Sequence, residues 1–117
     1  MDFTDLVVWQ RAKKVVLLIY RLTKDFPKEE IYGLTSQLRR ASSSVCANIA
    51  EGFGRYHTKD KIRFYYNARG SVSECMSHLS IAGDLGYISN DNAKNLLSEF
   101  ETIRKMVNGM VRALGKG

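Results

Sequence analysis

Apolar residues recur at helical spacing along four stretches of the chain, separated by short segments rich in glycine and polar residues. A repeat every three or four residues is typical of helices that bury one face. The fourth stretch is the most regular, because two apolar rows repeat one heptad apart within it. The four seams are Val8, Ala12, Val15, Ile19 and Leu22; Leu34, Leu38, Ala41, Val45 and Ile49; Ile62, Tyr65, Val72, Met76 and Leu79; and Ala93, Leu96, Phe100, Ile103, Val107, Met110 and Leu114.

Capping and turn residues divide the four stretches. Thr58 and Ser89 are placed to cap the helices that follow them, and Gly54 and Gly86 to end the helices before them. The later connections are only a few residues long, which favours antiparallel neighbours. The sequence therefore predicts an all-α, antiparallel up-down-up-down four-helix bundle, formed as a single domain by residues 1–117.

The first predicted helix is apolar on more than one side. An isolated bundle would leave part of this surface in water, so we expect self-association to bury it. The alternative is that Trp9 and Tyr20 are ordinary half-buried aromatics at the rim of the core. The apolar residues off its seam are Leu6, Val7, Trp9, Val16, Leu17, Leu18 and Tyr20.

The composition gives the net charge of the chain and indicates a cellular compartment. Eighteen Lys and Arg against twelve Asp and Glu give a net charge of +6, which suits an anionic partner. Cys46 and Cys75 lie inside apolar-periodic segments and the chain does not start like a signal peptide, so we expect a reducing cytoplasm. The longest strongly apolar run, residues 15–20, is too short for a membrane span, so no membrane association is expected.

The positive charge gathers at one end of the predicted bundle, which we call the basic pole. Antiparallel packing would bring together there the start of the first helix, the end of the second, the start of the third and the end of the fourth. Its basic residues are Arg11, Lys13, Lys14, Arg55, Lys59, Lys61, Arg63, Arg112 and Lys116, and its acidic residues are Asp2, Asp5, Glu51 and Asp60.

Six residues of the basic pole are candidates for nucleic-acid binding. Lys and Arg side chains contact phosphates, and the ring of Tyr56 could stack on an unpaired base. The alternative is a solvated helix joint, where Lys and Arg are common. The candidates are Arg55, Tyr56, Lys59, Lys61, Arg63 and Arg112.

Polar residues also lie beside or on the apolar seams of the second and third helices. If buried, they must find partners, and the carboxylates of Glu51 and Glu74 could pair with the guanidinium groups of Arg40 and Arg69 across the helices. We interpret Arg40, Asn48, Glu51, Arg69 and Glu74 as a structural polar network, because no nucleophile–base arrangement accompanies them.

The sequence offers little for catalysis. A zinc site built on Cys46, Cys75 and His78 would lack a fourth ligand, and buried free thiols are the favoured interpretation. The glycines of EGFGR do not match a phosphate-binding loop, which would carry Lys followed by Ser or Thr. We therefore predict no enzyme activity, no metal and no cofactor.

Several strings of the sequence resemble a known family. The segments LVVWQRA, FPKEEIYGLTSQLRRASSSVCANIAEGFGR, KIRFYYNARGSVSE and DLGYIS resemble the four-helix bundle proteins encoded in intervening sequences of bacterial large-subunit ribosomal RNA genes. The accessory protein of diversity-generating retroelements is a relative. Cys46 departs from the pattern, because the family often has proline there.

The resemblance implies a ring-like homopentamer with a basic surface for nucleic acid; in the retroelement relative, the ring also engages a reverse transcriptase. Residues and resemblance together predict a non-enzymatic homo-oligomer that binds structured RNA or DNA through its basic pole. The alternative is a protein-interaction scaffold that docks a partner such as a reverse transcriptase, with the charge serving solubility or steering.

Overall fold

The computed structural model describes residues 1–115 and contains four α-helices and two short 3-10 helices, without a strand among the residues described. The predicted all-α class with four helices is confirmed. Lys116, assigned to the basic pole from the sequence, lies outside the described residues. The elements are η1 (Phe3–Asp5), α1 (Val7–Thr23), η2 (Lys28–Glu30), α2 (Leu34–Gly54), α3 (Thr58–Asp84) and α4 (Asn90–Ala113).

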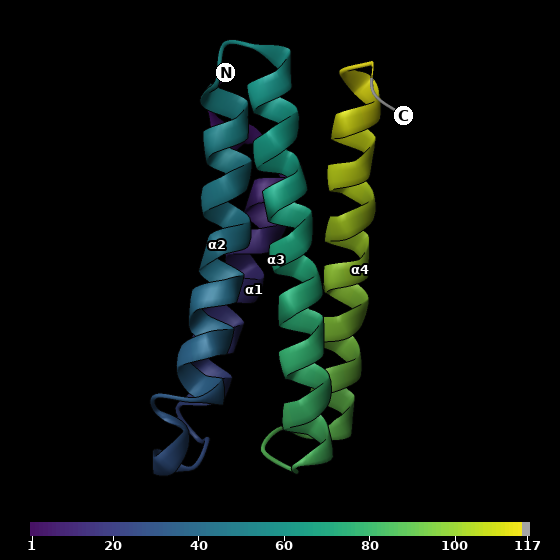
Figure 1. The fold of residues 1–117 in the computed structure, drawn as a ribbon. Helices are drawn as coiled ribbons and strands as arrows, with labels where there is room; N and C mark the ends of the chain where they lie inside the picture. The colour runs from purple at the N-terminus through teal and green to yellow at the C-terminus, as the bar shows by residue number, and fades with distance from the viewer. Residues whose placement is uncertain (116–117) are drawn as a thin grey trace.

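The four α-helices lie side by side in an elongated molecule of 43 × 21 × 20 Å (Figure 1). The N-terminus, the α2–α3 turn and the last turn of α4 lie at one end, and η2 and the α3–α4 turn lie at the other. Contacts are most extensive between α2 and α3, followed by α3 and α4, whereas α1 packs on α2 and only sparsely on α4. The α2–α3 pair is therefore the most firmly packed part of the fold.

The predicted seams form the core. Val8, Ala12, Val15 and Ile19 of α1 are buried, as are the central seam positions of α2; in α3, Cys75 is buried in place of the predicted Met76, which is only partly buried. At the end of α4 the buried residue is Val111, while Met110 and Leu114 are only partly buried. A straight helix drifts about 20° per heptad from an exact seven-residue repeat, so the inward face shifts by one position towards the end of α4.

α2 and α3 approach each other closely at Gly52. A Cβ on Gly52 would lie 2.6 Å from Cε1 of Tyr65 and 3.2 Å from the carbonyl oxygen of Lys61. Tyr65 is buried, so its ring occupies the space that a larger residue at position 52 would need. Farther along, the Ser71 hydroxyl donates to Ser44 Oγ at 3.0 Å and joins the two helices.

Of the four residues predicted to cap or end a helix, two do so as predicted. Ser89 caps α4, since its Oγ accepts from the Asn92 N–H at 3.1 Å, and Gly86 follows α3 with φ of 77°, a left-handed conformation that favours glycine. The prediction for Thr58 was wrong, because Thr58 is the first residue of α3 and the N-cap is His57, which forms no side-chain cap. Gly54 remains helical as the last residue of α2.

The outer side of α1 carries exposed apolar residues. Val7, Leu17, Leu18 and Tyr20 are exposed, whereas Trp9 is half-buried and meets Phe3 edge-on with ring centroids 5.1 Å apart. The monomer therefore leaves the side of α1 off its seam in water, as the pattern indicated. None of the helices within residues 1–115 is long and apolar enough to cross a bilayer.

Candidate nucleic-acid interface

The six candidate residues of the basic pole lie on three chain segments at one end of the molecule. These are the α2–α3 turn, which begins with Arg55, the first turns of α3, which carry Lys59, and the last turn of α4, which carries Arg112 (Figure 1). α2 ends at Gly54, and α3 starts only four residues later, so the side chains of the joint share a small area. The six candidate residues play four different structural roles there.

Arg55 and Arg63 share one aromatic ring. Their guanidinium carbons lie 4.6 and 4.5 Å from the ring centroid of Phe64, within the range of cation–π contacts. Arg55 also pairs with Glu51 at 3.0 Å, and Arg63 with Asp60 at 3.7 Å. Both guanidinium groups thus contact the same ring and one carboxylate each.

Tyr56 projects into solvent beside this pair of arginines. Its side chain is 90% exposed, and its ring meets His57 edge-on with centroids 5.1 Å apart. This exposure leaves Tyr56 without a role in the core. Its ring face is accessible to a ligand.

Among the six candidates, Lys59 and Arg112 are the exposed cations that form no ion pair and no side-chain hydrogen bond within residues 1–115. Lys59 lies in the first turn of α3 and Arg112 in the last turn of α4. Their charges are not offset by a nearby carboxylate partner. They are therefore the candidates best placed to contact phosphates.

Lys61, a predicted nucleic-acid contact, instead makes its contacts within the protein. Its Nζ donates to the carbonyl oxygens of Phe53 at 2.8 Å and Gly52 at 3.4 Å, and it lies 5.6 Å from the centroid of the Phe53 ring. These carbonyls belong to the last turn of α2; the Gly52 oxygen also accepts from the Arg55 N–H at 3.3 Å, and the Phe53 oxygen accepts from Lys61. Lys61 therefore closes the end of α2 from the neighbouring helix.

Arg11 and Lys13 also serve contacts within the chain. Arg11 forms a bidentate pair with Glu99 of α4, with N–O distances of 2.9 and 2.7 Å, and this hydrogen bonding and charge raise the pKa of Arg11 above its ordinary value. Lys13 lies 5.6 Å from the Trp9 ring centroid. Arg11 thus ties α1 to α4, and Lys13 covers an aromatic side chain of its own helix.

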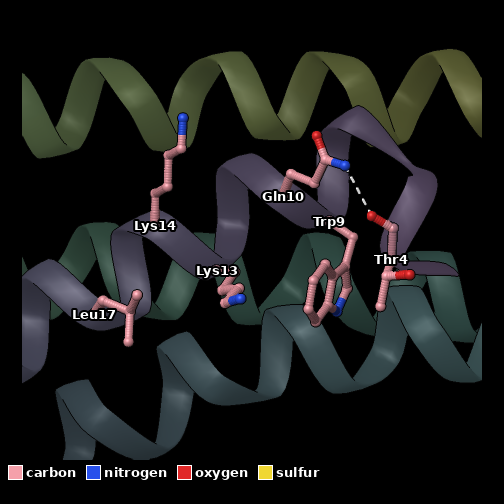
Figure 2. A pocket seen from close by; sticks show the side chains of 6 residues that line it. All are labelled: Thr4, Trp9, Gln10, Lys13, Lys14 and Leu17. Carbon is pink, nitrogen blue, oxygen red and sulfur yellow. Dashed lines mark hydrogen bonds between the residues drawn. The ribbon is translucent and has the colours of Figure 1, made fainter.

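Figure 2 shows a hollow on the outer side of α1, with Trp9 and Leu17 on one flank and Lys14 on the other. Gln10 donates to the Thr4 carbonyl oxygen at 2.8 Å along its edge. Lys14 points towards α4, while Trp9 points towards α2. This hollow lies on the exposed apolar side of α1 and is separate from the α2–α3 joint.

The predicted polar network is divided among separate contacts. Arg40 of α2 pairs with Glu74 of α3, and the same carboxylate lies 3.4 Å from His78 Nε2. Arg69 donates to Asn108 of α4 at 2.9 Å. Asn48 donates within its own helix, to Ser44.

Glu51 and Arg69 are not brought together, contrary to the pairing considered from the sequence. Glu51 pairs with Arg55 at the end of its own helix. Gly52 lies against Tyr65, so Glu51 is about one helical turn away from Arg69 along α3. The sequence correctly placed Glu51 and Arg69 on adjacent helices. It could not show the register between these helices, which decides which side chains meet.

The two thiols are shielded. Burial raises the pKa of Cys46 to about 11 and that of Cys75 to about 12, in the latter case with help from the charge of Glu74. Both cysteines are free, and within residues 1–115 no group of three or more His, Cys, Asp or Glu side chains is placed to hold a metal ion. At neutral pH these thiols therefore stay protonated.

Phe64 is the member of the basic pole that the sequence reasoning missed. It lies off the apolar seam of α3, between Arg63 and the buried Tyr65. The sequence could have indicated Phe64, because it is an aromatic residue next to Arg63 on the outer side of the first turns of α3. Its contact with Arg55 required the three-dimensional course of the α2–α3 turn.

Comparisons with known proteins identify a matching family and a solved structure with a similar fold. The family model described as 23S rRNA-intervening sequence protein matches residues 4–109. A solved structure of a protein with unknown function from the S23 ribosomal protein family of Bacteroides thetaiotaomicron VPI-5482 superposes with a TM-score of 0.81 at 18% identity, covering 90% of this chain and 98% of that one. The comparison with curated proteins returns no match.

Proposed function

This chain belongs to the 23S rRNA-intervening sequence protein family, and we propose that it is a non-enzymatic, oligomeric protein that binds structured RNA or DNA through its basic pole. The membership confirms the resemblance found in the sequence. The observation that carries the proposal is the placement of Lys59 and Arg112 at one end of the molecule, exposed and without a carboxylate partner in the described chain.

The charge of the pole favours a polyanion. Arg55 and Arg63 form ion pairs within the protein and Lys61 donates hydrogen bonds within it, so Lys59 and Arg112 supply the main phosphate contacts in this proposal. Contacts of this kind give affinity without sequence preference, and the affinity falls as salt rises. The overall charge of +6 acts in the same direction.

We further propose that antiparallel bundles assemble as a homopentameric ring. The exposed apolar side of α1, with Val7, Leu17, Leu18 and Tyr20, supplies surface that such an assembly would bury. A ring presents the basic pole several times to one strand, so individually weak phosphate contacts would add up by avidity. This multiplicity compensates for the reliance on Lys59 and Arg112 as the main phosphate contacts of each copy.

A salt series on the wild-type protein and two charge-reversal variants tests the proposal. We expect the wild type to bind labelled RNA or DNA with an affinity that falls steeply with salt, and Lys59→Glu with Arg112→Glu to weaken binding by roughly tenfold or more. The matched control is Lys24→Glu with Lys94→Glu, which changes the net charge equally at exposed positions of the other pole. Light scattering on the same samples measures the oligomer.

Two results would contradict the proposal. An intact oligomer that binds neither RNA nor DNA at low salt would indicate a scaffold for a protein partner instead. Equal losses in the two charge-reversal variants would show that overall charge, and not the basic pole, governs binding.

A further inference from the structure

We infer that the basic pole prefers unpaired nucleotides to duplex, with bases stacking on the guanidinium planes of Arg55 and Arg63 and on the ring of Tyr56. This inference rests on the proposed function and specifies which part of a structured RNA or DNA the site takes, namely its unpaired stretches. It follows from a feature of the pole that phosphate binding does not need, namely planar groups held in place with exposed surfaces.

Phe64 and two carboxylates contact the two guanidinium groups. The guanidinium carbons of Arg55 and Arg63 lie 4.6 and 4.5 Å from the Phe64 ring centroid, and Glu51 and Asp60 each engage one NH2 group. A guanidinium held by both a ring and a carboxylate loses less conformational freedom when a ligand stacks on it. Both arginines therefore have contacts on the protein before a ligand binds.

The same carboxylates make these arginines less suited to phosphates. Glu51 and Asp60 form ion pairs with Arg55 and Arg63, at 3.0 and 3.7 Å, and so offset their charges. Stacking uses the plane of the guanidinium and leaves those ion pairs intact. A division of labour follows, in which Lys59 and Arg112 contact phosphates and the arginines contact bases.

Surface for stacking is available. The side chains of Arg55 and Arg63 are 43% and 59% exposed although each contacts Phe64, and Tyr56 is 90% exposed beside them. A base offers its flat face only when it is unpaired and unstacked, because a duplex presents base edges in its grooves. Aromatic rings and arginine planes along a positive surface are the usual means of holding single strands.

Binding measurements with three labelled probes test the inference: an unstructured oligouridine strand, its deoxythymidine counterpart and a duplex of the same length. We expect the wild type to bind the single strands more tightly than the duplex. Arg55→Lys with Arg63→Lys keeps both charges and removes both planes, so single-strand affinity should fall by about tenfold, or about 1.4 kcal/mol. Duplex affinity should stay within about twofold, because phosphate contacts depend on charge.

Arg104→Lys is the matched control. Arg104 pairs with Glu101 three residues before it, as Arg63 pairs with Asp60, but it has no cation–π contact within residues 1–115. This variant should change neither affinity. Thermal unfolding of each variant shows whether the fold is retained, and Tyr56→Leu, at a residue outside the core, gives an independent reduction in single-strand affinity.

The outcomes separate this inference from the proposed function. Steeply salt-dependent binding with equal wild-type affinity for single strands and duplex would overturn the inference and leave the proposed function standing. Proportional losses for both forms in the double Lys variant would also overturn it, because the arginines would then be contacting phosphates. Binding to none of the probes would contradict the proposed function itself.

Discussion

Gly52 lies where α2 comes closest to α3, and its missing side chain is what permits that approach. The space that a Cβ would fill is occupied by the buried ring of Tyr65, 2.6 Å away at its nearest atom, and by backbone of the facing helix. Gly54, the second glycine of the EGFGR string, is different, because a Cβ there would have no contacting atom within 4 Å. The first glycine of this string therefore serves packing.

Substituting Gly52 should destabilise the fold although glycine is a poor helix former. Gly52→Ala gains up to about 1 kcal/mol of helix propensity but overpacks a site bounded by a buried ring, at a cost of about 1–3 kcal/mol. We expect a net loss of about 1–2 kcal/mol in the free energy of unfolding, measured by urea titration.

Gly70→Ala is the control for this prediction. Gly70 lies inside α3, is exposed, and has nothing within 4 Å of a Cβ position, so alanine there should stabilise by about 0.5–1 kcal/mol. Equal effects of the two substitutions would show that propensity alone decides and that the contact with Tyr65 relaxes easily.

At the scale of elements, helical periodicity was enough to predict the four helices, because each helix must bury one continuous face. The interhelical contacts could not be predicted in the same way. Glu51 and Arg69 were correctly placed on neighbouring helices, but the register set by Gly52 against Tyr65 separates them. Likewise, nothing local to Lys61 indicates that its Nζ reaches back to the end of α2.

Removing the charge of Lys61 should lower stability, whereas removing the charge of Lys59 should weaken nucleic-acid binding. Lys61→Met keeps much of the apolar stem but loses the hydrogen bonds to the Phe53 and Gly52 carbonyls, so the free energy of unfolding should fall by about 1 kcal/mol. Lys59→Met should leave stability nearly unchanged, because Lys59 is exposed and has no ion-pair partner among residues 1–115, but it should weaken nucleic-acid binding. Urea titration and binding anisotropy on both variants check the pair.

A reversed pattern, with Lys59→Met destabilising and Lys61→Met weakening binding more, would contradict the division between a helix-closing lysine and a phosphate-contacting one. The nucleic-acid measurement should be made in urea-free buffer at a temperature well below unfolding, so that the stability difference does not enter the affinity.

At the scale of the whole molecule, an apolar surface and a charged surface lie on different parts of the bundle. The exposed apolar residues of α1 run along its outer side, whereas the unpaired cations Lys59 and Arg112 lie at the ends of α3 and α4. The two surfaces can therefore be altered independently. The proposed ring uses the first for assembly and the second for binding.

Leu17→Glu should dissociate the oligomer without unfolding the bundle, because Leu17 is 46% exposed in the monomer and a carboxylate there would be desolvated only in the assembly. Ile81→Glu is the matched control, at an apolar α3 position that is 47% exposed and lies outside the proposed interface. Light scattering should show a smaller particle for the first variant only, with circular dichroism unchanged in both.

Because binding is proposed to depend on repeated basic poles, the dissociated variant should also bind nucleic acid more weakly while Lys59 and Arg112 are intact. Retained affinity in a fully dissociated Leu17→Glu protein would show that a single basic pole is sufficient and that avidity plays no part.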